Sequence, residues 1–264
     1  MDYGLRGRVA LVNAASRGLG RGIAEALAAE GARLVITSRD EAAVRRAARE
    51  ISVAHRAEVV PVAADVASAG AAERAAGAAI ENFGALDILI TNSGGPPGGG
   101  FTDFDDAAWQ QAFELLLLSV ARMVRATLPH LRASGHGRIV NVASSAVREP
   151  IPGLILSNAM RAGVAGLAKT LAGELAPDQI TVNTVLPGRI LTDRLRGPFI
   201  EPARSAGVSV DDLARAEVAK EVPLGRVGEP SDMGNLVAFL CSDAAAYLTG
   251  LAVPVDGGRL RSVF

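Results

Sequence analysis

The sequence predicts an α/β fold in which a single domain is built as a doubly wound parallel sheet with helices on both faces. Short runs rich in Val, Ile and Leu alternate with Ala-rich segments of helical periodicity. Strands that are buried on both faces of a parallel sheet form such nearly continuous apolar runs. The chain has 264 residues, 49% of them hydrophobic, so that one domain can bury a large core without disulfides or metal.

Each expected strand is a short apolar run bounded by polar or Gly-containing segments. In chain order, these runs cover residues 9–12, 34–38, 59–63, 88–91, 138–143, 181–186 and 252–255. The segments between them carry apolar residues at helical spacing and are rich in Ala, which favours helix. The expected helices cover residues 20–30, 41–51, 71–82, 107–131, 157–175 and 231–241. Because no repeat or linker interrupts this order, we expect one domain over residues 1–264.

Two segments interrupt the alternation of strands and helices. Residues 94–100 have the sequence GGPPGGG directly after the fourth expected strand, and neither helix nor strand tolerates this density of Gly and Pro. Residues 194–222 form a Pro-bounded, partly helical insertion that is longer than a usual connection, and we expect it to be a lid over the substrate. Both should lie at the carboxyl ends of the strands, where ligands bind in this architecture.

The composition argues against several classes of partner. With 27 basic and 28 acidic residues scattered along the chain, no basic patch indicates binding to nucleic acid or to an acidic membrane. The apolar stretches are interrupted by charges, and no signal peptide is recognisable, so we expect a cytoplasmic protein. Cys241 is the only cysteine and lies in an apolar helical run, where we expect a buried, inert thiol. We therefore expect no disulfide and no metal site.

A turn of sequence NAASRGLG, residues 13–20, follows the first expected strand and opens a helix. Its glycines, Gly18 and Gly20, would let the backbone approach a pyrophosphate at the positive end of that helix. A Gly-x-Gly pair alone also fits an ordinary strand-to-helix turn. Further motifs follow in order: DV at residues 65–66, TNSGG at 91–95, LPGRILTD at 186–193, and PLGRVGEP, FLCSD, YLTG and VDGG between residues 223 and 258.

In this order and spacing, the motifs resemble those of the short-chain dehydrogenase/reductase family, and the overall sequence is similar to 3-oxoacyl carrier-protein reductases. The resemblance spans essentially the whole chain and implies a Rossmann-type fold that binds a nicotinamide cofactor. It also implies that Thr192 contacts the carboxamide of the nicotinamide. The residues that the resemblance assigns to the cofactor are Asn13, Ser16, Arg17, Gly18, Leu19, Gly20, Ser38, Arg39, Asp65, Val66, Asn92, Ser93, Gly94, Arg161, Pro187, Gly188, Ile190 and Thr192.

The residues around the expected adenosine pocket favour a phosphorylated cofactor. The second strand ends on Ser38 and Arg39, where relatives that prefer NAD carry an acidic residue for the ribose hydroxyls. Arg17 adds a second guanidinium, and paired guanidinium donors suit a phosphate, although each arginine alone also fits a solvated surface charge. We therefore expect NADP(H) to be favoured over NAD(H). Ala14 stands at a glycine position of the family, where its Cβ restricts φ and crowds the phosphate.

The positions that resemblance assigns to catalysis are largely substituted. The family carries an Asn on the long central helix, a Ser after the fifth strand, and a Tyr and a Lys one turn apart on the next helix. Its phenol exchanges a proton with the substrate, and its lysine lowers the pKa of the phenol. The serine is present as Ser144, but the Tyr, Lys and Asn positions hold Ser157, Arg161 and Leu116.

Misalignment does not explain this absence, because the only tyrosines, Tyr3 and Tyr247, lie far from this helix in the sequence. Ser157 and Arg161 are four residues apart, which places them on one helix face. Arg161 can clamp ribose hydroxyls, but it cannot exchange its proton near neutral pH. Ser157 is a much weaker acid than tyrosine, and its small side chain leaves a void that substrate could fill.

Replacement acid–base residues are scarce. Glu149 is the best candidate because it follows Ser144 in the loop that lines the substrate pocket of the family, although an exposed ion pair with Arg148 is an equal alternative. Asp193 is a weaker second candidate. The three histidines fall in stretches of surface character, where we expect solvated rather than catalytic side chains; they are His55, His130 and His136.

These observations favour an atypical NADP(H)-dependent oxidoreductase that acts on a carbonyl or alcohol of a small molecule. Two alternatives remain, because fold alone does not determine function. One is a non-redox enzyme, such as a dehydratase, isomerase or lyase, and the other is a catalytically inactive NADP(H)-binding protein. The resemblance also implies a homotetramer, with subunits paired through the helices predicted over residues 107–131 and 157–175.

Overall fold

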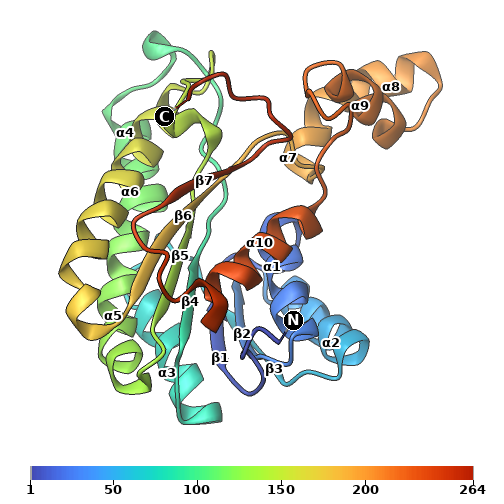
Figure 1. Ribbon diagram of the computed structural model, residues 1–264. Helices are drawn as coiled ribbons and strands as arrows, with labels where there is room; N and C mark the ends of the chain where they lie inside the picture. Colours follow the sequence, from blue (N-terminus) through green and yellow to red (C-terminus); the bar gives the residue numbers. More distant parts are fainter. Residues whose placement is uncertain (1, 264) are drawn as a thin grey trace.

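Seven parallel strands form one sheet in the computed structural model, which describes residues 2–263 (Figure 1). Their order is β3-β2-β1-β4-β5-β6-β7, so the winding reverses between the neighbouring strands β1 and β4. The boundaries of the seven predicted strands are confirmed to within one residue. The strands are β1 (Val9–Val12), β2 (Arg33–Ser38), β3 (Val59–Ala63), β4 (Ile88–Thr91), β5 (Arg138–Val142), β6 (Thr181–Pro187) and β7 (Ala252–Val255).

Helices cover both faces of the sheet, as the sequence predicts (Figure 1). One face is covered by α1 (Gly18–Ala29), α2 (Glu41–His55) and α10 (Pro230–Cys241). The opposite face is covered by α3 (Ala71–Phe83), α5 (Ser119–Ser134) and α6 (Ile155–Glu174). Side chains alternate along each strand, so that Ala10 and Val12 face the first layer while Val9 and Leu11 face the second.

The helix predicted over residues 107–131 is confirmed, but it contains a π-helical turn that the sequence did not predict. The chain forms α4 (Asp106–Phe113), a π-helical turn (Glu114–Leu118) and then α5. Ser119 closes the wide turn by donating its backbone N–H to the carbonyl of Glu114, and its hydroxyl donates to the carbonyl of Leu115 at 2.6 Å. An apolar run carries no sequence signal for one extra residue in a turn, and π turns of this kind often mark functional sites.

His136 is not solvated, in contrast to the prediction from sequence. Its side chain is 4% exposed and lies below β5, where the end of α10 covers it. Its Nε2 is 3.1 Å from the carbonyl of Cys241, and its Nδ1 is 3.1 Å from a carboxylate oxygen of Asp243. Burial lowers the pKa of His136. Cys241 is fully buried, as predicted, and burial raises the pKa of its thiol to about 12.

The segment predicted as an insertion projects from the carboxyl edge of the sheet (Figure 1). It contains α7 (Asp193–Arg196), α8 (Ile200–Ala206) and α9 (Val210–Ala219). Buried residues of this segment and of the chain on either side of it form a small apolar cluster separate from the two layers of the sheet: Leu191, Ala214, Val218, Val222 and Val227. Across residues 2–263, no helix has the length and apolar character needed to cross a membrane.

Candidate functional site

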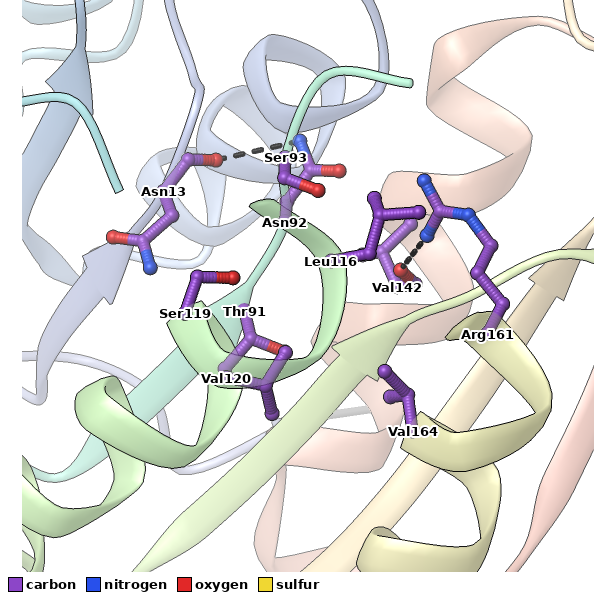
Figure 2. Close-up of a pocket in the computed structure, with 10 residues that line it drawn as sticks. All are labelled: Asn13, Thr91, Asn92, Ser93, Leu116, Ser119, Val120, Val142, Arg161 and Val164. Carbon is purple, nitrogen blue, oxygen red and sulfur yellow. Dashed lines mark hydrogen bonds between the residues drawn. The ribbon is translucent and has the colours of Figure 1, made fainter. Parts of the chain in front are cut away.

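A small cavity lies at the carboxyl edge of the sheet, between β1, β4, β5 and the helices α5 and α6 (Figure 2). Its volume of about 10 Å³ has room for about one water molecule. The cavity brings together several residues singled out from sequence. It is lined by Asn13, Thr91, Asn92, Ser93, Leu116, Ser119, Val120, Val142, Arg161 and Val164.

Side-chain amides and hydroxyls fix the strand ends around this cavity. The amide of Asn92 donates to the carbonyls of Asn13 at 3.3 Å and of Ala14 at 3.4 Å. The hydroxyl of Thr91 donates to the side chain of Asn141 at 2.7 Å. The bonds of Asn92 join the loops after β1 and β4, on either side of the point where the winding of the sheet reverses, and the bond of Thr91 joins β4 to β5. Ligands bind at this point in doubly wound folds.

The two glycines of the loop between β1 and α1 are required for different reasons, the backbone conformation at Gly18 and a close approach at Gly20. Gly18 has a φ of +59°, and a Cβ there would lie 3.5 Å from the methyl of Thr192. A Cβ on Gly20 would overlap the carbonyl of Ala14. Ala14 itself has a φ of +50°, in the left-handed region that favours glycine. The sequence prediction that Ala14 strains this loop is consistent with that geometry.

The polar residues at the end of β2 lie against the first loop. The hydroxyl of Ser16 donates to that of Ser38 at 3.0 Å, and Arg39 next to them is exposed. The following carboxylate, Asp40, accepts from the backbone N–H of Ala43 at 2.9 Å and thereby caps α2. The acidic group that follows Arg39 in the sequence is therefore hydrogen-bonded to the start of its own helix. On β3's side, Asp65 accepts from the backbone of Ala67 at 3.1 Å, beside the buried Val66.

Arg17 is not free at this site. It is exposed and forms an ion pair of 2.9 Å with Asp193 at the start of α7. Asp193 also contacts Arg196 at 3.4 Å. The pairing with two arginines makes Asp193 a poor choice for the general base considered from sequence. It also links the loop after β1 to the insertion across the edge of the sheet.

Ser157 and Arg161 occupy the inner face of α6, as their spacing predicts. Ser157 is 6% exposed. Arg161 donates from Nη1 to the carbonyl of Val142 at 2.8 Å, and its guanidinium points past Leu116 (Figure 2). Burial, together with the positive charge of Arg194, lowers the pKa of Arg161 to about 10. Leu116 lies in the π turn opposite, where it is 2% exposed and supplies no polar group.

The loop after β5 places the remaining catalytic candidates outside the cavity. The Oγ of Ser144 accepts from the backbone N–H of Ala146 at 3.1 Å, which leaves its hydroxyl hydrogen available to a ligand. Arg148 donates to the carbonyl of Ala252 at 2.7 Å. Glu149 is exposed and makes no ion pair within residues 2–263, so the alternative of an Arg148–Glu149 pair is wrong. Neither Ser144 nor Ser157 lines the cavity around Arg161.

The predicted cofactor-binding residues between Pro187 and Thr192 lie along the loop after β6. Thr192 faces Gly18, as described above, and the bond from the N–H of Gly188 to the carbonyl of Val255 measures 3.0 Å. Ile190 is buried and pairs with Gly228, while Pro187 ends β6. On the opposite loops, Gly94 is exposed and Leu19 packs against the core at the start of α1. These residues border the same edge of the sheet.

Sequence reasoning missed two polar groups at this site. Ser119 is 3% exposed and lines the cavity, but it directly follows the π turn that the sequence did not reveal. Arg194 donates to the carbonyl of Pro96 at 3.2 Å and packs on Gly95. Its contact joins the insertion to the GGPPGGG loop, 98 positions apart in the chain. The sequence gives one sign of this contact, the high density of Gly and Pro in residues 94–100, which predicts a loop.

The geometry matches that of known proteins. A family model described as enoyl-(acyl carrier protein) reductase matches residues 13–259. The chain is 36% identical over 252 residues to the 3-oxoacyl-(acyl-carrier-protein) reductase FabG of Escherichia coli (strain K12), covering 96% of this chain and 97% of that protein. This chain belongs to the short-chain dehydrogenase/reductase family. It is also 35% identical over 259 residues to human dehydrogenase/reductase SDR family member 4, covering 96% of this chain and 88% of that protein.

Solved structures agree with this family and fold. L-sorbose reductase from Gluconobacter frateurii, complexed with NADPH and L-sorbose, superposes with a TM-score of 0.94 at 32% identity over 100% of both chains. YwfH, an NADPH-dependent reductase involved in bacilysin biosynthesis, gives a TM-score of 0.89 at 28% identity, covering 97% of this chain and 99% of that one. The predicted family and the predicted Rossmann-type fold are confirmed, and the oxidoreductase class agrees with these relatives.

Proposed function

We propose that this protein is an NADP(H)-dependent oxidoreductase that reduces a carbonyl, or oxidises an alcohol, of a small molecule. The observation that carries the proposal is the glycine cradle after β1, next to Ser16, Ser38 and Arg39, at the reversal point of the sheet. Several relatives that bear the same fold are reductases, and two of them are named with NADPH. The bound cofactor would supply or accept the hydride, and the chain would position the reacting groups.

The residues present fit a dinucleotide. Gly20 lets the loop after β1 fold back with the carbonyl of Ala14 against α1. The N-terminus of this helix carries backbone N–H groups and a dipole that favour a pyrophosphate. Arg39 would hold the 2′-phosphate, because its guanidinium is exposed at the end of β2 and pairs well with phosphate oxygens. The neighbouring carboxylate of Asp40 is directed to its own helix, where it accepts from the N–H of Ala43. Arg161 would hold the nicotinamide ribose with the N–H donors that Val142 does not use.

The route of the proton must differ from that of relatives with a Tyr–Lys pair. In our proposal, the hydroxyl of Ser144 donates a hydrogen bond to the substrate oxygen. The oxygen of this hydroxyl accepts from the N–H of Ala146, and its hydrogen is left for the substrate. Arg161 stays protonated near neutral pH and stabilises negative charge without exchanging a proton. Water then carries the proton to the oxygen. General acid catalysis is commonly worth about a hundredfold to ten-thousandfold, so turnover would be slow but not abolished.

We further propose that the protein acts in the cytoplasm as a homotetramer, with residues 194–222 as a lid over the substrate. The small side chains along α6 support the assembly, because Ala162 and Gly166 are exposed and a Cβ at Gly166 would meet nothing within 4 Å. This face permits close approach of a second helix. Light scattering at micromolar concentration should give the mass of four chains, and a monomer mass would contradict the assembly.

The proposed activity can be tested by adding NADPH and a panel of ketones, aldehydes and 3-oxo esters to the purified protein. We expect loss of NADPH fluorescence with at least one class of carbonyl, and slower loss with NADH. Arg39→Ala should lessen the difference between the two cofactors, whereas Arg45→Ala, a change of an exposed arginine in α2, should not. Tight binding of NADPH without turnover on any carbonyl would favour the catalytically inactive alternative instead.

A further inference from the structure

The chain that follows β3 makes a tight turn at the carboxyl edge of the sheet, beside the end of β2. Ala64 begins this turn, and its backbone N–H donates to the carbonyl of Ser38 at 2.9 Å. The carboxylate of Asp65 accepts from the N–H of Ala67 at 3.1 Å, and its carbonyl accepts from the N–H of Ser68 at 2.9 Å. The turn of residues 64–68 is therefore tied to β2 at its start and held internally by Asp65.

A guanidinium from α5 holds the other end of this turn. Arg122 donates from Nη1 to the carbonyl of Ala67 at 2.7 Å, although the two residues are 55 positions apart in the chain. Arg122 is half-buried, and it takes part in no ion pair within residues 2–263. A hydrogen bond from a charged donor is stronger than one between neutral groups. The bond of Arg122 therefore fixes the turn to the long helix.

Packing against the same helix fixes the middle of the turn. Val66 is 7% exposed and belongs to the same buried apolar cluster as Val120 and Val124 of α5. Asp65, which precedes it, is half-buried. Its Oδ1 accepts from Ala67, and within residues 2–263 its Oδ2 has no hydrogen bond. The turn therefore presents one unused carboxylate oxygen at the edge of the sheet, with α5 holding the residues on its far side.

We propose that Arg122 is a positioning residue for the adenine ring of NADP(H), and that it acts through the turn of residues 64–68. The proposal rests on the proposed function, because it concerns the adenosine end of the same cofactor. Ser38 lies beside the expected 2′-phosphate, and its carbonyl bond to Ala64 places the turn next to that end. A carboxylate oxygen accepts a hydrogen bond from an amino group but not from a carbonyl oxygen. Oδ2 of Asp65 would accept from the 6-amino group of adenine, and Arg122 would hold the turn that carries it.

The test compares NADPH with its hypoxanthine analogue, deamino-NADPH, in which a carbonyl oxygen replaces the 6-amino group of adenine. Titration calorimetry of the full chain should show NADPH binding about tenfold more tightly, as for one charge-assisted hydrogen bond. Arg122→Met should lower this ratio to about twofold or less, because the turn no longer holds Asp65 in place. Arg122→Lys keeps a charged donor and should retain a higher ratio than Arg122→Met.

A matched control is Arg125→Met, which removes an exposed arginine of α5 three residues after Arg122 and should leave the ratio unchanged. If Arg122→Met does not fold, Arg122→Gln, with a shorter and uncharged polar side chain, takes its place and the same ratio decides.

Two results would overturn the proposal while leaving the proposed function intact. One is equal affinity of the unmutated protein for the two dinucleotides. The other is an Arg122→Met protein with lower Tm, or with both affinities reduced equally, and an unchanged ratio, because a purely structural role gives that result. Failure of the unmutated protein to bind NADPH would overturn the proposed function itself.

Discussion

Replacement of Ala14 by glycine should stabilise the protein and strengthen its binding of NADPH. Ala14 has a φ of +50°, and its carbonyl is hydrogen-bonded to Asn92 at 3.4 Å, which holds the loop in this conformation. The left-handed conformation costs an L-residue about 1–2 kcal/mol. Glycine avoids this cost but loses about 0.4–1 kcal/mol through the greater freedom of the unfolded chain. The midpoints of these two ranges differ by about 0.8 kcal/mol, which is the expected net gain.

Calorimetric unfolding can measure this gain. For a domain of this size, about 1 kcal/mol shifts Tm by about 2–4 °C, so Ala14→Gly should raise Tm by about 1–4 °C. Affinity for NADPH should also rise, because the methyl no longer crowds the expected pyrophosphate. Arg56→Gly is the matched control, since Arg56 has a φ of +54° at the end of α2, away from the cavity. It should raise Tm similarly and leave NADPH affinity unchanged.

The reasoning would be refuted if Ala14→Gly left Tm unchanged or lowered it while Arg56→Gly raised it. A second comparison is Ala15→Gly, because Ala15 is fully buried and is not among the residues with positive φ. It loses a packed methyl as well as chain rigidity, and we expect it to lower Tm. Opposite signs at two adjacent alanines would show that the backbone conformation, not loop flexibility in general, decides the effect.

Three further predictions concern the cofactor, the altered helix and the pH dependence of stability. Arg39→Ala should reduce the ratio of NADPH to NADH affinity by about tenfold, the value of one charge-assisted contact at an exposed site; equal affinities in the unmutated protein, measured by calorimetry, would contradict it. Ser157→Tyr with Arg161→Lys should lower turnover of the native substrate by about tenfold, because a phenol ring overfills a site where Ser157 is 6% exposed; unchanged or improved kinetics would overturn this. Because burial lowers the pKa of His136 in the folded state, the unfolded state takes up its proton first, and urea unfolding should show stability falling as pH drops below about 6.5. His136→Gln should flatten that dependence, and an unaltered slope would exclude His136 as its source.

The layered fold could be predicted from sequence because strand and helix periodicities report burial directly. The run from Val9 to Val12 is apolar at every position. This pattern is typical of a strand that is covered on both faces, and all four residues are buried in the structure. The ends of helices are harder to predict from sequence than the helices themselves. The end of α2 at His55 depends on Arg56 adopting a left-handed conformation, for which the sequence offers no glycine as a signal.

The parts of the site that escaped prediction depend on contacts between distant segments. His136 is buried because the end of α10 folds over it, and nothing in the residues around His136 encodes that cover. Leu116 is 2% exposed within the π turn, yet an apolar run has the same composition in an α-helix and in a π turn. Arg194 and Gly95 meet only because the insertion returns to the loop after β4. The assignment of the Tyr and Lys positions to Ser157 and Arg161, in contrast, rests on counting along the sequence and stays a prediction.

A crystal structure with NADPH would test the central claim most directly, namely that this chain holds NADP(H) at the carboxyl edge of the sheet with Arg161 in place of a Tyr–Lys pair. The account predicts the pyrophosphate before the N-terminus of α1, the 2′-phosphate against Ser38 and Arg39, and the nicotinamide ribose hydrogen-bonded to Arg161. An empty cleft at saturating NADPH, or a nicotinamide ribose bound away from Arg161, would contradict it.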